Sequence, residues 1–177
     1  MKTLRLILGD QLNYNHSWFK EVDGNVTYVL MEVKTETSYV KHHAQKVIGI
    51  FAAMRAFARH LEKDGHQVIY FNLDDDSNRQ SFSENIKALV REEGFTHFEY
   101  LLPDEYRVDR HLRELSEELS IPAKAYDTEN FFTGRGEVQE FFKGKKTYLM
   151  ETFYRHMRKK HQVLMDTAGK PEGGKWN

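Results

Sequence analysis

A glycine and two polar side chains follow the first apolar run of the chain, residues 4–8. If that run is a strand of an open parallel α/β sheet, Gly9, Asp10 and Gln11 lie at its carboxyl end, where such sheets bind ligands. A carboxylate accepts hydrogen bonds and an amide both donates and accepts them, which suits a polyhydroxylated chain or the edge of a heterocycle. The turn therefore predicts a small-molecule site. The alternative is that Asp10 only caps the next helix or turn.

More polar side chains follow the second apolar run, residues 26–31. Glu32 and Glu36 bring two carboxylates, and Tyr39 a phenol, to the edge of the sheet that carries Asp10. The three residues are candidates for one wall of a pocket. The alternative is an acidic, solvated loop with Tyr39 packed on the surface.

The side chains of Glu36 and Tyr39 face the same side only if a helix begins near them. They are three residues apart, so both face one side if Thr35 or Thr37 opens a helix there. Ile50 lies eleven residues beyond Tyr39, which is about three helical turns. It is a candidate for the apolar face against a planar ring.

Other residue clusters predict no metal or catalytic site. His42 and His43 are adjacent, and neighbouring side chains on a helix point about 100° apart, which fits a surface pair at a helix start better than shared metal ligation. The DDD run at 74–76 precedes Ser77 and Asn78 and is typical of a turn and a helix cap. The G-x-x-x-x-G-K-[ST] and G-x-G-x-x-G patterns are missing, so ATP and NAD are poor candidates. No nucleophile stands out, and we expect no catalytic residue and no metal site.

Composition limits the class of protein. With 177 residues, 40% hydrophobic and 13% aromatic, the chain is long enough for one domain with a core and an appendage. Lys and Arg number 26 against 27 Asp and Glu, so no global basic field gathers nucleic acid. The lack of cysteine excludes disulfides, cysteine-bound zinc and a thiolate-ligated iron–sulfur cluster within these residues. No apolar run approaches the roughly 18 residues of a membrane helix and no signal-peptide pattern opens the chain, so we expect a cytoplasmic protein without membrane contact.

Strands and helices alternate along most of the chain. Apolar runs rich in β-branched and aromatic residues predict five strands, at residues 4–8, 26–31, 66–71, 95–102 and 121–126. Helical spacing of apolar residues predicts helices at 47–61, 86–93 and 112–119, with Gly65 and Gly94 ending the first two. This order predicts an α/β fold with a Rossmann-like, open, five-stranded, mostly parallel sheet, helices on both faces and a C-terminal helical extension.

The alternation stops after residue 130, which predicts an α/β domain at 1–130 and a helical extension and linker at 131–177. Residues 149–165 have the pattern of a long helix. Its predicted apolar face carries Met150, Phe153, Tyr154 and Met157, and the other side carries Arg155, Arg158, Lys159 and Lys160. Residues 167–177 are rich in glycine, which is typical of a loop.

Several separated motifs carry a family resemblance. They are LILGDQL at 6–12, Glu32, SYVKHH at 38–43, FAAMRAFA at 51–58, DD at 74–75, EYR at 105–107, METFYR at 150–155 with Met157 and Arg158, and GGKWN at 173–177. Through these motifs the chain closely resembles the N-terminal domain of the deoxyribodipyrimidine photolyase-related family, the iron–sulfur bacterial cryptochromes and (6-4) photolyases.

The resemblance implies an antenna domain. In this family the N-terminal α/β domain binds 6,7-dimethyl-8-ribityllumazine and passes excitation energy to FAD, in blue-light harvesting for DNA repair or signalling. The FAD and the 4Fe-4S cluster belong to a helical C-terminal domain that follows the GGKWN motif and is missing here. The resemblance thus implies a fragment of a DNA photolyase-related flavoprotein, a lyase, that is not catalytic alone.

The resemblance also implies which residues surround the lumazine: Gly9, Asp10, Glu32, Glu36, Tyr39 and Ile50. Gly9 lets the backbone approach closely, the carboxylates accept hydrogen bonds from ribityl hydroxyls or ring N–H groups, and Tyr39 and Ile50 sandwich the ring. Gln11 remains a candidate from the chemistry of its turn. Lys34 departs from the family pattern, since an uncharged residue is expected between the two glutamates.

The expected partners follow from the same resemblance. They are the small-molecule chromophore, the missing C-terminal photolyase domain and, in the full-length context alone, DNA. Surface left bare by the missing domain, with Phe131, Phe132, Phe153 and Tyr154 exposed, favours a homodimer. Two alternatives stay open: a nucleic-acid contact through the basic face of residues 151–160, and a free-standing α/β nucleotide-binding or interaction protein without photochemistry.

Overall fold

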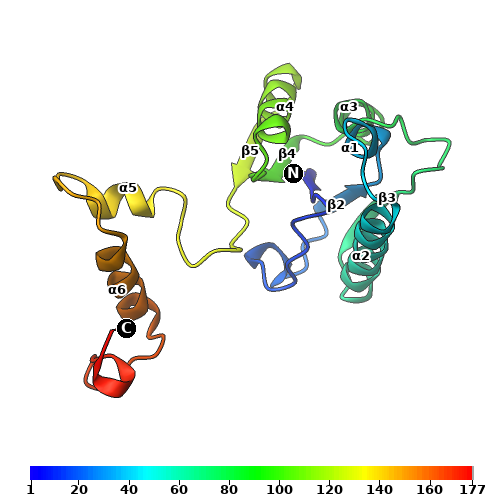
Figure 1. The fold of residues 1–177 in the computed structure, drawn as a ribbon. Helices are drawn as coiled ribbons and strands as arrows, with labels where there is room; N and C mark the ends of the chain where they lie inside the picture. The colour runs from blue at the N-terminus through cyan, green and yellow to red at the C-terminus, as the bar shows by residue number, and fades with distance from the viewer. Residues whose placement is uncertain (177) are drawn as a thin grey trace. The chain divides into compact units, whose positions relative to one another are not determined.

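A computed structural model describes residues 1–176, and the chain divides into two compact units, Met1–Thr128 and Glu129–Asn177. The first unit is the α/β part and the second holds the C-terminal helices (Figure 1). Asn177, the last residue of the GGKWN motif, lies outside the described residues. The assignment of the two parts as an antenna domain and a linker stays a prediction.

Five strands form the sheet of the first unit: β1 (Thr3–Leu6), β2 (Val26–Met31), β3 (Gln67–Phe71), β4 (His97–Leu101) and β5 (Ala123–Tyr126). Their order in the sheet is β3-β2-β1-β4-β5, and every neighbouring pair is parallel. All six residues of β2 are buried, as expected of a strand covered on both faces. The predicted five-stranded, Rossmann-like sheet is confirmed, and it is parallel throughout.

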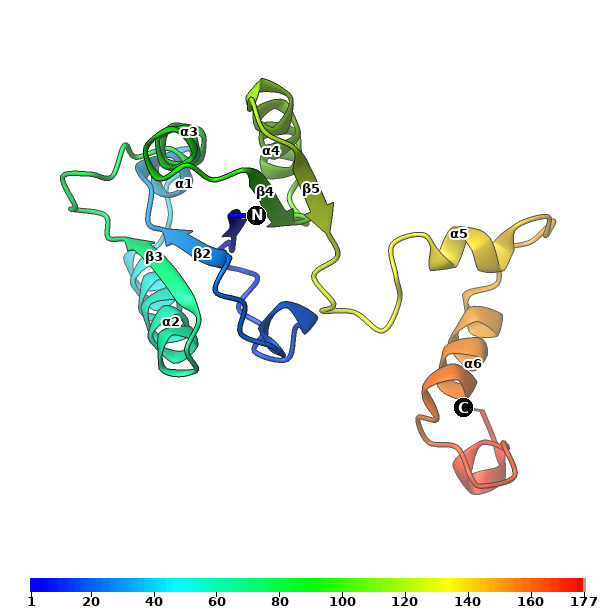
Figure 2. The same ribbon diagram turned by 180° about the vertical axis from the view of Figure 1, so that it is seen from behind.

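Helices cover both faces of this sheet. On one face α2 (Ala44–Lys63) packs its buried Met54, Phe57 and Leu61 against Tyr28 and Leu30 of β2. On the other face lie α3 (Phe82–Glu93) and α4 (Tyr106–Glu118), seen from behind in Figure 2. A 3-10 helix at Ser17–Phe19 and the short helix α1 (Lys34–Ser38) complete the unit. The alternation of side chains along each strand thus builds two separate apolar layers.

Glycines end the helices where the sequence predicts. Gly94 caps α3 in the left-handed conformation with φ of 67°, and Gly65 follows α2 with φ of 94°. The helix whose apolar residues span 47–61 begins at Ala44, where the Nδ1 of His43 accepts a hydrogen bond from the backbone N–H of Gln45 at 3.2 Å. His43 therefore starts a helix, as predicted.

The strand order reverses at β1, which has β2 on one side and β4 on the other. The connection that leaves β1 carries Trp18 into the apolar layer on the α2 face, whereas the connection that leaves β4 runs through α4 on the other face. The chain therefore leaves the carboxyl ends of these two neighbouring strands toward opposite faces and opens a crevice between them, which is the usual ligand position in such sheets.

The second unit contains α5 (Glu137–Phe142), α6 (Met150–His161) and a 3-10 helix at Glu172–Gly174. α6 is shorter than the predicted 149–165 because Gln162 adopts the left-handed conformation, with φ of 55°, and ends it. Phe153, expected on an exposed face, is 6% exposed, so that expectation is wrong. Phe131 and Phe132 are exposed, but a homodimer through them stays a prediction.

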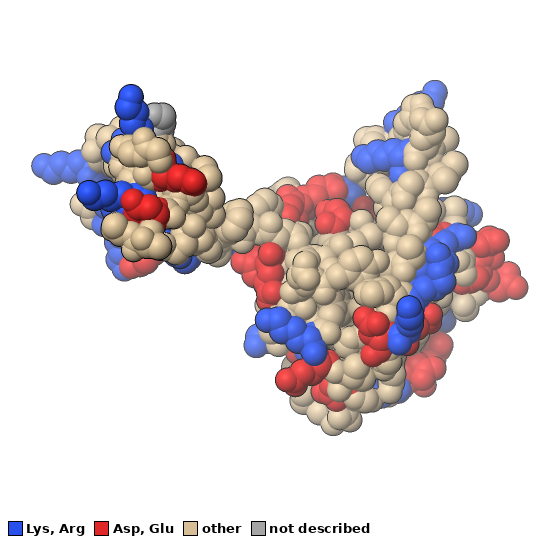
Figure 3. Space-filling view, turned by 90° about the horizontal axis from the view of Figure 1, so that it is seen from below, with Lys and Arg blue, Asp and Glu red and all other residues tan. Residues whose placement is uncertain are grey.

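The basic face predicted for α6 is partly occupied within the unit. Arg158, expected on that face, is buried and donates hydrogen bonds to the carbonyls of Val163 at 3.1 Å and Leu164 at 2.5 Å. These bonds satisfy carbonyls that follow the helix end. Arg155 pairs with Glu151 one turn away. On the face of the molecule shown in Figure 3, acidic and basic side chains are interspersed, in keeping with the net charge of −1.

In the part of the chain that the structure describes, no helix combines the length and apolarity needed to cross a membrane.

Candidate functional site

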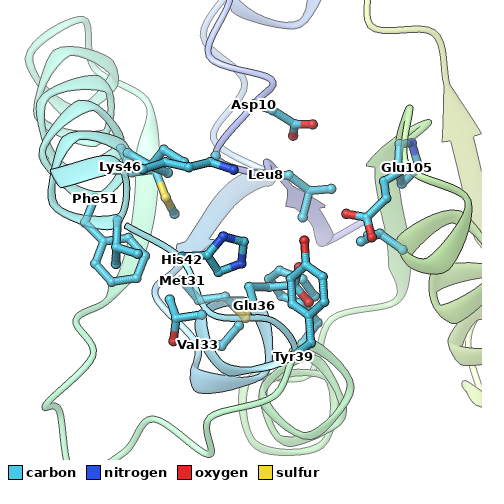
Figure 4. A pocket seen from close by; sticks show the side chains of 18 residues that line it. Leu8, Asp10, Met31, Val33, Glu36, Tyr39, His42, Lys46, Phe51 and Glu105 are labelled. Atoms are coloured by element: carbon cyan, nitrogen blue, oxygen red, sulfur yellow. The ribbon is translucent and has the colours of Figure 1, made fainter. Parts of the chain in front are cut away.

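A cavity of about 270 Å³ lies at the carboxyl edge of the sheet, at the β1–β4 reversal (Figure 4). Its walls come from the ends of β1 and β2, from α1 and the segment after it, from the first three turns of α2, and from the start of α4. The polar residues in these walls are Asp10, Glu36, Thr37, Tyr39, His42, Lys46 and Glu105. Segments far apart in sequence thus meet at the position where the sequence predicts a small-molecule site.

Five of the seven predicted site residues line the cavity: Gly9, Asp10, Glu36, Tyr39 and Ile50. Gln11 and Glu32 are not part of its lining. Lys34 is exposed and does not line it either, and its backbone N–H donates to the Oε1 of Gln80 at 3.2 Å. The structure places these five residues around one cavity. That they contact a ligand remains a prediction.

Glu32 is a fully buried carboxylate that the fold itself uses. Its Oε1 accepts hydrogen bonds from Arg55 at 2.6 Å and from the hydroxyl of Tyr70 at 2.7 Å, and its Oε2 accepts from Arg55 at 2.8 Å and from the backbone N–H of Leu73 at 3.0 Å. Burial by itself raises the pKa of Glu32, but these hydrogen bonds outweigh it and lower that pKa. Glu32 therefore ties β2 to α2 and to the end of β3.

Gln11 joins two strand ends instead of facing the cavity. Its Oε1 accepts from the backbone N–H of Leu8 at 3.1 Å, and its Nε2 donates to the carbonyl of Leu101 at 3.1 Å. The side chain is 3% exposed. Because Leu8 follows β1 and Leu101 ends β4, Gln11 links the two strand ends that border the crevice.

Gly9 permits a close approach of α2 to the end of β1. A Cβ at this position would lie 2.8 Å from the Cγ2 of Ile50 and 3.0 Å from the Sδ of Met54, both closer than side chains pack. Ile50 and Met54 line the cavity with Val47 and Phe51. Glycine at position 9 therefore lets α2 form an apolar wall, a role distinct from the predicted approach to a ligand.

α1 places Glu36 and Tyr39, but not through the predicted start. The helix begins at Lys34 with Val33 as its N-cap, so neither Thr35 nor Thr37 opens it. Tyr39 is the C-cap residue and is 47% exposed. The two side chains nevertheless reach the same cavity.

His42 is a functional candidate that the sequence did not predict. It is partly exposed, unlike the exposed His43, and its ring lines the cavity with Nε2 buried and without a hydrogen-bond partner in the described structure. The edge of its ring meets Tyr39, with ring centroids 5.1 Å apart. The signal available in the sequence was its position three residues after Tyr39, at the same sheet edge.

Carboxylates gather on one side of the cavity and cationic or basic groups on the other. Figure 4 shows Asp10 and Glu105 facing Lys46 and His42 across the opening. Desolvation raises the pKa of Asp10, and the nearby carboxylates of Asp104, Glu105 and Glu36 raise it further. This rim can accept hydrogen bonds from hydroxyl or ring N–H groups.

Comparison with known proteins identifies the family. The family model described as deoxyribodipyrimidine photo-lyase-related protein matches residues 5–177. The chain belongs to this photolyase-related family. It is 36% identical over 178 residues to a (6-4) photolyase of Agrobacterium fabrum, covering 100% of this chain and 35% of that protein. It is 23% identical over 186 residues to uncharacterized protein R852 of Acanthamoeba polyphaga mimivirus, covering 100% of this chain and 91% of that protein.

Two other motifs of the photolyase-related chain have clear places in the fold. The carboxylate of Asp75 accepts from the backbone N–H of Asn72 at 2.6 Å, so the DD motif forms a turn, as predicted. The helix cap predicted at Ser77 and Asn78 is wrong, because α3 begins at Phe82 with Ser81 as its N-cap. Glu105 and Arg107 of the EYR motif stand at the start of α4, beside the cavity, where Arg107 Nε donates to Glu105 Oε1 at 2.8 Å. Among the described residues no group of three or more His, Cys, Asp and Glu side chains is arranged to hold a metal ion.

Proposed function

We propose that this cavity binds an antenna chromophore of the 6,7-dimethyl-8-ribityllumazine class, and that the chain is the light-harvesting module of a photolyase-related protein. The observation that carries the proposal is the division of one cavity into an apolar wall and a polar rim. A planar two-ring heterocycle bearing a polyhydroxylated chain needs both, the first for its ring and the second for its hydroxyls and ring edge.

The apolar side fits a ring. Ile50 and Met54 of α2 supply apolar surface to the lining, and Tyr39 supplies an aromatic ring to the same cavity. The volume, about 270 Å³, is close to the lower end of the roughly 300–1,000 Å³ found for small-molecule pockets. In this proposal the ring occupies the cavity and the hydroxylated chain extends toward the acidic rim.

The polar side has unused hydrogen-bonding capacity. The Nε2 of His42 is buried without a partner in the described structure, and such an atom costs about 1–3 kcal/mol until something satisfies it. A ring carbonyl or N–H of the chromophore would satisfy it, depending on the tautomer of His42. Asp10 and Glu105 would accept hydrogen bonds from ribityl hydroxyls.

The protein's part in this function is placement. The bound chromophore supplies absorption of blue light, and the chain fixes its position and orientation and excludes water from one face of its ring. The chain spans 35% of the length of the (6-4) photolyase it matches, so transfer to FAD, and DNA repair or signalling, belong to the proposal for the whole protein. With no cysteine in these residues, ligands of a 4Fe-4S cluster would come from elsewhere.

Titration of the purified chain with 6,7-dimethyl-8-ribityllumazine, followed by absorption and fluorescence, tests the proposal. Ile50→Trp fills the cavity, and Ile48→Trp is a matched control because Ile48 is 67% exposed on the same helix and does not line it. We expect saturable binding by the wild type and the control, and none by Ile50→Trp. No binding by the wild type, or equal binding by all three chains, would overturn the proposed function.

A second candidate is a free-standing α/β nucleotide-binding or interaction protein without photochemistry. It is favoured by the match to R852, because the chain covers 91% of that protein and no large further domain is left over there. Titration with ATP and FMN beside the lumazine separates the two candidates. Preference for a phosphate-bearing nucleotide would support the second.

A further inference from the structure

The α1 wall of the cavity has little stability of its own. α1 has five residues, buries none of them and lacks a side-chain hydrogen bond at its N-cap. Isolated helices shorter than about 12–15 residues are marginal in water. Yet this segment and the residues just after it bring Glu36, Tyr39 and His42 to the cavity. Contacts from outside the segment must therefore hold it.

Gln80 accepts from the backbone N–H of Lys34, and Arg107, the second residue of α4, makes the contacts that reach Glu36 and Tyr39. Its Nη1 donates to the Oε1 of Glu36 at 2.9 Å, and its Nη2 donates to the Oε2 of Glu36 at 2.6 Å. The guanidinium carbon lies 4.1 Å from the centre of the Tyr39 ring. Glu105 holds the same guanidinium by accepting from its Nε at 2.8 Å. One planar cation thus meets both a carboxylate and an aromatic ring of the wall.

Arg107 does not line the cavity, so any effect on a ligand passes through its neighbours. Tyr39 contacts both the guanidinium of Arg107 and the ring of His42. A shift of Tyr39 would therefore also move the unpartnered Nε2 of His42. Lysine could not replace arginine here, since it lacks the planar fork that binds a carboxylate through two N–H groups and stacks on a ring.

We propose that Arg107 is a positioning residue that holds the α1 wall, and through it Glu36, Tyr39 and His42, in the geometry that binds the chromophore. The inference rests on the proposed function for the identity of the ligand. The side chains of Arg107 and Glu36 are 39% and 26% exposed, and exposed ion pairs add little to global stability. The consequence of losing Arg107 is accordingly a loosened wall in a folded protein.

Arg107→Gln tests the inference, with Arg110→Gln as its matched control. Arg110 stands one turn further along α4, is 67% exposed and pairs with Glu114 of the same helix. In the chromophore-free chain we expect Arg107→Gln to speed backbone hydrogen exchange at residues 34–43, with little change in the melting temperature. We expect its lumazine affinity to fall about tenfold, a difference of about 1.4 kcal/mol. Arg107→Lys should resemble Arg107→Gln, and Arg110→Gln should resemble the wild type in both measurements.

Hydrogen exchange separates this inference from the proposed function, because it needs no ligand. Unchanged exchange at 34–43 in Arg107→Gln overturns the positioning role, whatever the chain binds. If Arg107→Gln exchanges faster at 34–43 but the wild-type chain binds no lumazine, the proposed function is overturned and the positioning role stands. Should Arg107→Gln unfold, Glu36→Gln removes the same pair from the other side, and it must speed the same exchange. When Arg107→Gln and Glu36→Gln are combined, their effects on hydrogen exchange at 34–43 must be less than additive, because both remove the same ion pair.

Discussion

Replacing Glu32 by glutamine distinguishes a framework carboxylate from a ligand contact. Glutamine keeps the shape of the side chain but puts an NH₂ in place of one oxygen. If that NH₂ replaces Oε2, it faces two donors, the Nη2 of Arg55 and the backbone N–H of Leu73. Both donors would then lose their acceptor at a side chain with 0% exposure. We therefore expect Glu32→Gln to destabilise the protein even when no ligand is present.

The size of the loss follows from the two donors. Losing the acceptor of a buried N–H costs about 1–3 kcal/mol. The side chain of Arg55 is 45% exposed and regains water, so its share is at most about 1 kcal/mol. The sum is about 1–4 kcal/mol, or a fall in melting temperature of about 2–16 °C for a chain of this size. Urea unfolding and calorimetry of the ligand-free chain measure both quantities.

The pH dependence of the same variant has a definite sign. The pKa of Glu32 is lowered in the folded state from its ordinary value of 4.5. Its ionised form therefore contributes stability that is complete above pH 4.5 and is lost as the pH falls through the lower folded-state value. Glu32→Gln should remove this part of the acid dependence. Glu62→Gln, at an exposed position near the end of α2, is the control. A stability loss no larger than that of the control would refute the framework role.

Two further predictions concern the cavity itself. Gly9→Ala places a methyl group 2.8 Å from the Cγ2 of Ile50 and should displace the apolar wall, so that lumazine affinity falls. Gly49→Ala, with open space around its Cβ, should instead stabilise α2 by about 0.5–1 kcal/mol, and equal affinities for the two variants would contradict this account. The pKa of Asp10 is raised in the folded state above its ordinary value of 3.8. The folded protein therefore holds this proton more tightly than the unfolded chain, and stability falls as the pH rises above 3.8 and Asp10 ionises. Asp10→Asn should therefore gain stability relative to the wild type as the pH rises above about 4. A relative loss in urea unfolding above that pH would show that the carboxylate is stabilised instead.

Much of the fold could be predicted because local patterns determine it. The second strand was predicted at 26–31 and forms over the same residues. A central strand is covered on both faces, so it appears in the sequence as a continuous apolar run whose ends are easy to locate. Gly94 ends α3 because only a residue without Cβ adopts its φ of 67° without strain. The end of α6 was missed because Gln162 adopts the left-handed conformation there, and the spacing of apolar residues does not show the conformation of a single residue.

The candidate site was likewise predictable where it depends on topology and not where it depends on contacts between distant residues. Sheet topology alone brings the residues that follow β1 and β2 to one edge, and this placed Asp10, Glu36 and Tyr39 correctly at a common cavity. It could not show that the partners of Glu32 lie 23 and 38 residues away, at Arg55 and Tyr70. A polar residue in the right place is a ligand contact when its hydrogen bonds are not already used, and the sequence does not record that.

Hydrogen-bond capacity therefore sorts the polar residues of the sheet edge better than position does. Glu32 and Gln11 have their capacity taken by the strands and helices that they join, so they shape the crevice without entering it. His42 retains a buried Nε2 without a partner in the described structure, which no requirement of the fold explains. Arg107 takes up both oxygens of Glu36 yet leaves that side chain in the lining. On this reasoning Glu32 and Gln11 serve the fold, Glu36 is held by Arg107, and the Nε2 of His42 is the buried polar atom still open to the proposed ligand.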